Sequence, residues 1–483
     1  MNEPSRRPRG HRRPSTGASK GTPHDQDRAS AIDEPRKVAY KLLRAVDEDG
    51  AYANLALPGL LSSHGLTGRD AAFATELAFG TLRWQGLYDV IIREATGRRL
   101  SELEPRVVDV LRLGCHQIQA MAVPDYAAVS ASVSLARGIS SSGPSRLVNA
   151  VLRRVASRSR DEWVALLAPD STLDPVGHLS VALSHPGWIT RALRDALAGA
   201  GLGDFDTLTQ LLATDNQPSS VMLVARPGRI SATALAEQSG GSAGRWSPWA
   251  VLSPGGNPGD LAAVRTGLAG VQDEGSQMAA LAFSRLAPQS DDDSWLDMCA
   301  GPGGKTAVLA GLAAEHAATV TAVELHPHRA ELVRAAVAGG PGTVHVETAD
   351  ATIRGWNPGR HSRVLLDAPC TGLGVLRRRP ELRWRRKPAD VATLASLQRR
   401  LLTAALTAVA PGGLALYVTC SPHVAETDAV VADVVRDVGG CEQEDARELL
   451  ADVPDLGPGP AARLWPHIHG TDGMFIAVIR RHR

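Results

Sequence analysis

Two cysteines directly follow strand-like apolar runs in the last quarter of the chain. Cys370 comes three residues after Asp367, and Cys420 lies within the segment YVTCS (417–421). A thiolate is a strong nucleophile, but a free thiol is little ionised at neutral pH, so a reactive cysteine needs a neighbour that lowers its pKa. A single cysteine is more often a small buried hydrophobe. Two cysteines and a carboxylate that follow two strands at one edge of a sheet favour covalent chemistry instead.

The remaining three cysteines show no paired spacing. Cys115, Cys299 and Cys441 form no C-x-x-C motif with each other or with the first two, which argues against a zinc site. We expect free thiols and no bound metal. Cys115 and Cys441 lack a strand-end context, so we assign both to buried structural positions.

A glycine-rich turn, DMCAGPGGKT (297–306), follows another apolar run. Glycines let the backbone approach a ligand closely, but Cys299 stands where a Walker A loop needs glycine, and the G-x-G-x-x-G pattern is also absent. Glu324 ends the next strand and can accept both hydroxyls of a ribose. Asp350 follows the third strand and can bond an adenine amino group. The pattern therefore predicts a cofactor that contains a nucleoside.

Strands and helical patterns alternate from about residue 266 onward, and this alternation positions the chemistry. It predicts a doubly wound parallel sheet whose ligands bind at the carboxyl ends of the strands. The expected strands are 295–299, 320–324, 344–347, 364–367 and 414–419.

The rest of the chain divides into three regions. Residues 1–34 are rich in Arg, Pro, Ser and Gly, so we expect a disordered basic tail, which either solubilises the protein or adds phosphate contacts. Residues 35–158 carry helical apolar stripes, such as Val38, Leu42, Leu43 and Val46, and predict an all-α domain. Residues 159–265 are mixed and predict a small α+β linker module. Residues 266–483 form the predicted α/β domain.

Composition excludes several classes of protein. The 483 residues are 43% hydrophobic and 21% charged, with a net charge of +1, which indicates a globular chain without a global nucleic-acid signature. No uninterrupted apolar run is long enough to cross a membrane, and the N-terminus lacks a secretory signal. We therefore expect a cytoplasmic protein without membrane contact.

At this point the sequence resembles a known family. The segments VQDEGSQ (271–277), CAGPGGKT (299–306), DAPCTGLGVLRRRPELRW (367–384) and YVTCS (417–421) are similar to motifs of RNA cytosine-5 methyltransferases. The segments GTLRW (80–84) and RLVNAVLRR (146–154) resemble the NusB-like domain of the RsmB (Sun) branch. The resemblance covers residues 35 to 483. It implies a multidomain fold: a NusB-like RNA-binding domain, a small α+β linker that also grips RNA, and a Rossmann-like class I methyltransferase domain.

The resemblance also implies a reaction and its residues. The methyl donor would be S-adenosylmethionine and the product 5-methylcytosine in small-subunit (16S) rRNA, either naked or in an assembling subunit, with no DNA substrate and a monomeric enzyme. Cys420 would be the nucleophile, Cys370 would help to release the product, and Asp367 would lie beside both cofactor and target base. The implied cofactor residues are Cys299, Ala300, Gly301, Pro302, Gly303, Gly304, Lys305, Glu324, Asp350 and Asp367.

Two other functions remain open at this stage. A NusB-like domain could serve transcription antitermination or ribosome assembly in a protein that only binds RNA. Alternatively, DNA cytosine methyltransferases carry their nucleophile in a Pro-Cys motif after the fourth strand, where this chain has Cys370. In that case Cys370 alone would attack the base.

A cluster of arginines follows Cys370, and we expect it to contact RNA phosphates rather than to form a solvated loop. Trp384 within the cluster either stacks on a base or packs in the fold. Lys305 is expected to lower the pKa of Cys420. Gly301, Thr371, Leu373 and Thr427 depart from the residues usual in the family, and we expect the chain to tolerate these changes. The arginines are Arg377, Arg378, Arg379, Arg383, Arg385 and Arg386.

Overall fold

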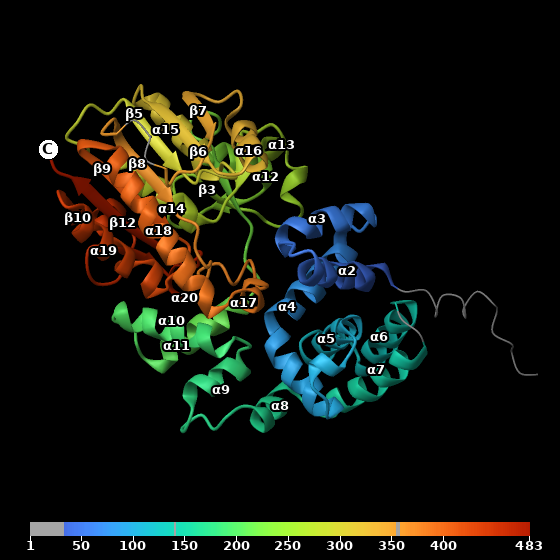
Figure 1. The fold of residues 1–483 in the computed structure, drawn as a ribbon. Coiled ribbons are helices and arrows are strands. Elements are labelled where there is room, and N and C mark those ends of the chain that lie inside the picture. The colour runs from blue at the N-terminus through green and yellow to red at the C-terminus, as the bar shows by residue number, and fades with distance from the viewer. Residues whose placement is uncertain (1–32, 140–141, 354–357) are drawn as a thin grey trace, which may run out of the picture.

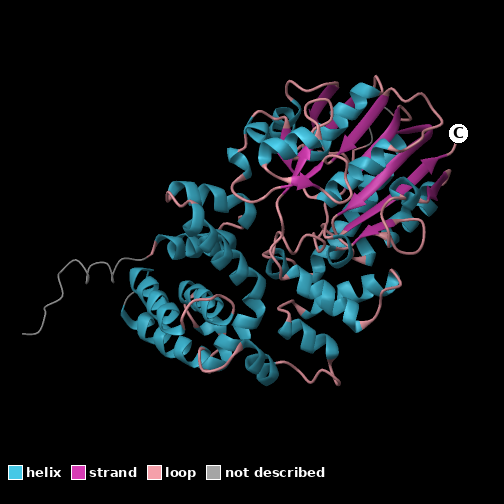
Figure 2. Ribbon diagram, turned by 180° about the vertical axis from the view of Figure 1, so that it is seen from behind, coloured by secondary structure: helices cyan, strands magenta, loops and turns pink. Residues whose placement is uncertain are grey.

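The computed structural model describes residues 33–139, 142–353 and 358–483. The expected disordered tail, residues 1–34, lies outside these ranges except for its last two residues. Figure 1 shows a helical half, which contains the first third of the chain, beside a sheet-containing half built from its C-terminal part. Figure 2 shows the same division from behind, with the strands gathered in one half.

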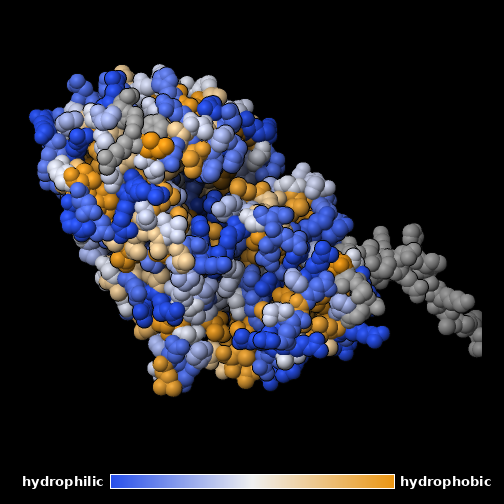
Figure 3. All heavy atoms as spheres, in the orientation of Figure 1, coloured by the Kyte–Doolittle hydropathy of each residue, from blue (hydrophilic) through white to orange (hydrophobic). Residues whose placement is uncertain are grey.

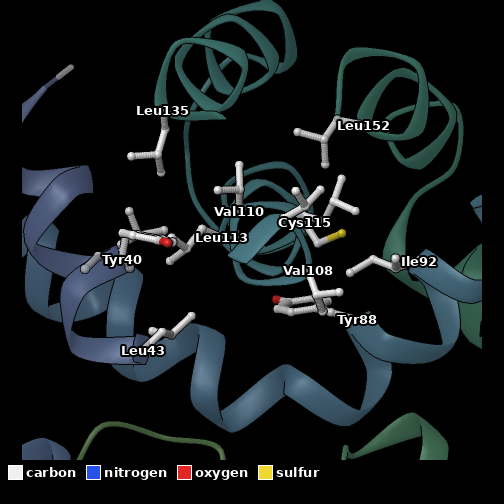
Figure 4. Close-up of a cluster of buried hydrophobic side chains, with 14 of the residues drawn as sticks. Tyr40, Leu43, Tyr88, Ile92, Val108, Val110, Leu113, Cys115, Leu135 and Leu152 are labelled. Atoms are coloured by element: carbon white, nitrogen blue, oxygen red, sulfur yellow. The ribbon is translucent and has the colours of Figure 1, made fainter. Parts of the chain in front are cut away.

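The first region is all-α, as its apolar stripes predict. Asp33 caps α2 by accepting a hydrogen bond from the Arg36 backbone N–H. The predicted stripe of α2 is buried, and so are Cys115 and Tyr88 in the same core (Figure 4). Burial of Cys115 confirms its structural assignment. The helices are α2 (Glu34–Glu48), α3 (Ala53–Ser63), α4 (Gly68–Thr96), α5 (Pro105–Gln119), α6 (Asp125–Ile139) and α7 (Ser142–Val155), with a short 3-10 turn, η1, at Leu100–Glu102.

Four further helices follow before the first strand. A capping box at Ser159 and Glu162 starts the first of them, and Asp174 and Asp204 cap two others. The last two helices share an apolar core with Leu376 and Trp465 of the C-terminal domain. The last two helices of this stretch therefore pack against the C-terminal domain. The helices are α8 (Arg160–Leu167), α9 (Pro175–Ala182), α10 (Gly187–Gly199) and α11 (Phe205–Asp215).

A small antiparallel sheet comes next. Its strands are ordered β2-β3-β1-β4, and β1 pairs with both β3 and β4. The last strand lies beyond residue 265, so the module takes one strand from the segment that we assigned to the next domain. The elements are β1 (Met222–Ala225), α12 (Ala232–Ser239), β2 (Ser242–Ala243), β3 (Ala250–Leu252), η2 (Pro258–Asp260), α13 (Ala262–Arg265) and β4 (Ala269–Val271).

The large sheet contains all five predicted strands in parallel. Its order is β10-β12-β9-β8-β5-β6-β7, with β11 added beside β12. The chain runs outward from β5 to β7 and then returns to β8 on the other side of β5, which places a switch point between β5 and β8. The parallel strands are β5 (Ser294–Met298), β6 (Thr319–Glu324), β7 (Thr343–Thr348), β8 (His361–Asp367) and β9 (Val409–Thr419).

The prediction of a purely parallel sheet is wrong at one edge. β12 pairs antiparallel with β9, and β10 and β11 both pair antiparallel with β12. A long C-terminal apolar strand can join an existing sheet edge without a crossover helix, so antiparallel pairing is available to it. The additional strands are β10 (Cys441–Glu444), β11 (Ala462–Leu464) and β12 (Met474–Arg481).

Helices cover both faces of this sheet. Alternate strand residues point to opposite faces, so Trp295 packs with α14 and α15 while its neighbour Leu296 packs with α18 and α19. None of the helices in the described ranges is long and apolar enough to cross a membrane. The helical elements are α14 (Glu274–Ser284), α15 (Gly304–Glu315), α16 (Pro327–Val337), α17 (Leu382–Arg385), α18 (Pro388–Ala408), η3 (Val424–Glu426), α19 (Asp428–Val438), η4 (Ala446–Leu450) and α20 (Pro466–His469).

Candidate active site

The two strand-end cysteines meet. Cys370 follows β8 and Cys420 follows β9, and these strands are neighbours in parallel register, with Asp367 opposite Val418. The Sγ atoms of Cys370 and Cys420 are 3.3 Å apart. The prediction that both sulfurs lie at one place on the sheet edge is therefore confirmed.

The two thiols differ in acidity because they are hydrogen-bonded to each other. That bond, with Cys370 as donor, lowers the pKa of Cys420, although burial acts in the opposite direction. The same bond, reinforced by burial, raises the pKa of Cys370 well above its ordinary value. Cys420 is therefore the thiol that ionises first, and Cys370 remains its neutral partner.

Lys305 and Asp367 form an ion pair beside the thiols. The Lys305 Nζ donates to Asp367 Oδ2 at 2.7 Å, and the Asp367 side chain remains 33% exposed. Burial has the largest single effect on the pKa of Lys305 and lowers it, but the charge of Asp367, the hydrogen bond to Asp367 and the charges of Cys420 and Asp297 together raise it. The positive charge of Lys305 also lowers the pKa of Cys420, as predicted, but less than the hydrogen bond from Cys370 does.

The glycine-rich turn joins β5 to α15 and packs tightly against the neighbouring helix. Gly303 has φ +104°, and a Cβ there would come within 2.8 Å of Ala336 Cβ, so the turn requires glycine at this position. At Gly301 a Cβ would lie 2.3 Å from Glu324 Oε2. Glycine at this position, where the family usually has alanine, leaves room for the Glu324 carboxylate, which agrees with the expectation that the change is tolerated.

Glu324 lies at the end of β6, and its carboxylate is almost fully buried. Its Oε2 accepts from the Gly301 backbone N–H at 3.0 Å, and its Oε1 accepts from the His326 backbone N–H at 3.0 Å. Arg329 pairs with the same carboxylate. Glu324 thus holds the glycine-rich turn against the second strand.

Asp350 lies two residues after β7, one strand further along the same edge. Its Oδ1 accepts from the backbone N–H and the hydroxyl of Thr352, at 2.8 and 2.7 Å. These two hydrogen bonds, the backbone one first, lower the pKa of Asp350. Both bonds are made to Oδ1, so the carboxylate is fixed at the strand end through one of its two oxygens.

Asp297, which we did not predict as a site residue, lies buried beneath the glycine-rich turn. Thr306 Oγ1 donates to Asp297 Oδ2 at 2.7 Å, while Oδ1 has no hydrogen-bond partner among the residues that the structure describes. Burial raises the pKa of Asp297 to about 7. The signal was an aspartate inside the otherwise apolar strand 295–299, a position where a carboxylate is costly unless something binds it.

These groups fit S-adenosylmethionine. The carboxylates of Glu324 and Asp350 are acceptors for ribose hydroxyls and an amino group, and the tight glycine turn lets the backbone approach closely. Asp297 Oδ1, which has no hydrogen-bond partner among the described residues, is a further buried acceptor. A set of acidic acceptors suits a ligand that carries positive charge.

The expectation that the arginine segment (residues 377–386) contacts RNA phosphates is contradicted at the fully buried Arg383, and its half-buried members also bind within the fold. Arg378 pairs with Asp472, and Arg386 donates to the carbonyls of Thr371 and Cys370 at 3.0 and 3.2 Å. Arg377 donates to the carbonyl of Gly470. These guanidinium groups hold loops together within the fold.

The other members of the arginine segment bind the helical half of the molecule. Arg383 is fully buried and donates to the carbonyls of Arg83, Ser184 and Asp215 and to the Asn216 side chain. Trp384 donates from its indole N–H to the carbonyl of Leu82 at 2.8 Å, which favours packing over base stacking. Figure 1 shows α17, which contains both residues, beside α4.

Arg385 and Arg379 complete the contact between the arginine segment and the helical half. Arg385 donates to the carbonyl of Ala51, and its guanidinium and that of Arg379 lie over the ring of Tyr52. On the face shown in Figure 3, the surface is hollowed between the two halves and is lined mainly by hydrophilic residues. The arginine segment is therefore the link between the two halves of the molecule.

Comparisons with known proteins agree with this architecture. The model of the 16S rRNA methyltransferase RsmB/F family matches residues 283–480, and that of the NusB family matches residues 33–157. A Mycobacterium tuberculosis protein named as a methyltransferase, MT1451, is 50% identical over 455 residues, which cover 94% of this chain and 98% of that protein.

Two more comparisons extend the match across the chain. The ribosomal RNA small subunit methyltransferase B of Pseudomonas putida is 30% identical over 460 residues, covering 92% of this chain and 98% of that protein. The crystal structure of PH0851 has the same fold, with a TM-score of 0.75 at 20% identity, covering 94% of this chain and 98% of that one. The chain thus belongs to the RsmB/F family of methyltransferases and carries an N-terminal NusB domain.

Proposed function

We propose that this protein transfers a methyl group to carbon 5 of a cytosine in small-subunit (16S) rRNA through a covalent bond between Cys420 and the base. The observation that carries the proposal is the 3.3 Å contact between the Cys420 and Cys370 sulfurs, in which Cys420 is the more acidic thiol. Relatives named as ribosomal RNA small subunit methyltransferase B support the choice of RNA.

The reaction begins at Cys420. Its thiolate adds to carbon 6 of the cytosine, a C–S bond forms, and carbon 5 becomes an enamine-like nucleophile. As the thiolate attacks, ring nitrogen 3 takes up a proton from solvent, and the Asp367 carboxylate beside the base accepts a hydrogen bond from that N–H. Lys305, 2.7 Å from Asp367, holds this carboxylate in place. The glycine-rich turn, Glu324 and Asp350 would hold S-adenosylmethionine, which would supply the methyl group: carbon 5 forms a bond to the methyl carbon as the sulfur–methyl bond breaks, and S-adenosylhomocysteine leaves.

The final step must release the enzyme. The proton on carbon 5 leaves to solvent, the C–H electron pair restores the double bond between carbons 5 and 6, and the C–S bond breaks. Cys370 donates a hydrogen bond to the departing Cys420 sulfur, which carries the negative charge. The raised pKa of Cys370, due first to its bond with Cys420 and then to burial, keeps it protonated for this role.

The target base must be reachable. A cytosine within a helical stack cannot meet a sulfur at the sheet edge, so we propose a single-stranded or flipped nucleotide as substrate. The NusB domain in the helical half would grip the flanking RNA. A ribosomal substrate would place this activity in the cytoplasm.

Separate cysteine variants test the proposal. The experiment incubates each variant with S-adenosylmethionine carrying a labelled methyl group and with 16S rRNA, and then measures labelled 5-methylcytosine and slowed protein bands on a denaturing gel. Cys420→Ala should abolish methyl transfer, and Cys370→Ala should accumulate a covalent RNA adduct. Cys441→Ala, which changes a half-buried cysteine in β10, is the matched control and should behave as wild type.

Two outcomes would overturn the proposal. An adduct in the Cys420→Ala protein would make Cys370 the nucleophile, as in DNA cytosine methyltransferases. RNA binding without any methyl transfer by the wild-type protein would instead favour the binding function of a NusB-like protein.

A further inference from the structure

A buried carboxylate lies between the two turns that carry the cysteines. Glu426 ends η3, six residues after Cys420, and is fully buried. Its Oε1 accepts from the Thr371 backbone N–H at 2.8 Å and from Gln398 Nε2 at 3.2 Å. Its Oε2 accepts from the hydroxyls of Thr371 and Ser421. Four donors therefore converge on one side chain.

Three of these four bonds come from direct neighbours of the two cysteines in the chain, and the fourth comes from Gln398 on α18. Thr371 follows Cys370 and Ser421 follows Cys420, so the carboxylate connects the turn after β8 to the turn after β9. The two hydroxyls also lie 3.0 Å from each other. Besides Glu426, the turns are joined by this hydroxyl contact and by a hydrogen bond from the Gly374 backbone N–H to the Cys420 carbonyl at 2.9 Å.

Other contacts hold this cluster from outside. The Tyr417 hydroxyl donates to the Glu426 carbonyl at 2.7 Å, and Gln398 Nε2 also donates to the Pro369 carbonyl at 2.9 Å. In the described part of the chain Glu426 forms no ion pair, so neutral donors alone compensate its burial. A buried charge is expensive, and keeping one here indicates a role beyond packing.

We propose that Glu426 is a positioning residue for methyl transfer, whose carboxylate sets the distance between the Cys370 and Cys420 sulfurs. The role in catalysis rests on the proposed function. Glu426 also acts through its charge: after the bond with Cys420 and burial, the negative charge of Glu426 further raises the pKa of Cys370. Removing the charge should therefore let Cys370 ionise more readily.

Binding of phenylarsine oxide measures the thiol geometry without any methyl transfer. The arsenic forms bonds to two nearby sulfurs, the two thiol protons leave with its oxygen as water, and no oxidant is needed. In Glu426→Ala the turns should separate, so the second thiol should no longer lie close to the arsenic once the first As–S bond has formed. Affinity for the arsenical should therefore fall about tenfold or more. Glu426→Gln should keep near-wild-type affinity, since hydroxyls can rotate to accept hydrogen bonds from an amide.

Methyl-transfer kinetics give the second readout. Glu426→Ala should lower kcat by about 100-fold at a nearly unchanged KM for S-adenosylmethionine, since small displacements of reacting groups cost this much. Glu426→Gln should retain most of kcat, but the alkaline limb of its pH profile should move to lower pH. A purely structural role would leave that limb in place. Glu448→Ala, an exposed carboxylate in the same domain, is the control.

Two further variants keep the test decisive if Glu426→Ala does not fold. Ser421→Ala removes the bond to the β9 turn and leaves the bonds to Thr371, so it should weaken arsenical binding, whereas Thr403→Ala, a hydroxyl on α18 bonded within its own helix, should not. Unchanged arsenical affinity in a folded Glu426→Ala or in Ser421→Ala would overturn the proposal. This result is independent of methyl transfer, so it is distinguishable from a failure of the proposed function.

Discussion

The arginine segment begins seven residues after Cys370, one member of the cysteine pair, yet the two regions use buried polar groups in opposite ways. At the cysteine pair, the Cys420 sulfur is hydrogen-bonded to the Cys370 sulfur at 3.3 Å, a weak bond that leaves the Cys420 thiolate able to attack a base. In the arginine segment, the guanidinium group of Arg383 donates hydrogen bonds to four acceptors in the helical half.

The comparison shows that the reactive thiols and the contacts that join the two halves of the molecule are provided by different side chains. Arg386 binds the Cys370 and Thr371 carbonyls at one end of the segment, and Arg383 binds the helical half a few residues earlier. The backbone of the catalytic turn is therefore connected through one short segment to the other half of the molecule. The attachment uses the terminal nitrogens of the Arg383 guanidinium, while its buried Nε has no hydrogen-bond partner among the described residues.

The largest expected effect comes from Arg383→Met. The Met side chain fills a similar space but leaves the acceptors at Arg83, Asp215 and Asn216 without a donor, so we expect a loss of about 3–5 kcal/mol in the free energy of unfolding. Chemical denaturation followed by circular dichroism measures it. Arg400→Met, which changes an exposed arginine of α18, is the matched control and should fall within about 0.5 kcal/mol of wild type.

An opposite result would break the comparison between the two regions. If Arg383→Met kept its stability but lost affinity for RNA, the segment would be an RNA-binding surface, as its composition first suggested. The same measurement on both variants separates these roles.

The sequence was sufficient for features that depend on short-range pattern. The five parallel strands follow from apolar runs separated by helical periodicity, and the meeting of Cys370 and Cys420 follows from strand ends that share one sheet edge. The antiparallel strand β12 was missed because the expected alternation of strand and helix stops at β9. Its pairing depends on a free sheet edge, which no local pattern reveals.

Other features depend on partners far away in the chain. Arg383 and Trp384 look like a basic patch, because their acceptors near residues 83 and 215 are carbonyl groups that any residue carries. Likewise, a single glutamate six residues after Cys420 gives no sign that four donors surround it. Main-chain acceptors are invisible to composition, so an arginine-rich segment cannot be assigned to RNA from sequence alone.

Cys370→Ala provides a pH-dependent test of the reactive region. Since the hydrogen bond from Cys370 is the main cause of the lowered pKa of Cys420, its loss should move the Cys420 thiolate to higher pH. The rate of Cys420 alkylation by iodoacetamide, followed by peptide mass mapping across pH 5 to 10, should therefore show a midpoint above that of wild type. An unchanged midpoint would mean that Lys305, rather than Cys370, controls the nucleophile. Cys441→Ala should leave the midpoint in place.

The smallest expected effect comes from Trp384→Phe, which sharpens the assignment of the arginine segment to attachment. The substitution removes the indole N–H bonded to the Leu82 carbonyl while keeping an aromatic ring, so stability should fall by about 1 kcal/mol. RNA affinity, measured by fluorescence anisotropy, should stay unchanged. Gly86→Ala approaches the same contact from α4, because its Cβ would lie 2.4 Å from the Trp384 ring, and it should destabilise in the same direction. If Trp384→Phe kept its stability but bound RNA more weakly, Trp384 would be a base-stacking residue. The RNA-binding surface would then include the contact between the two halves of the molecule.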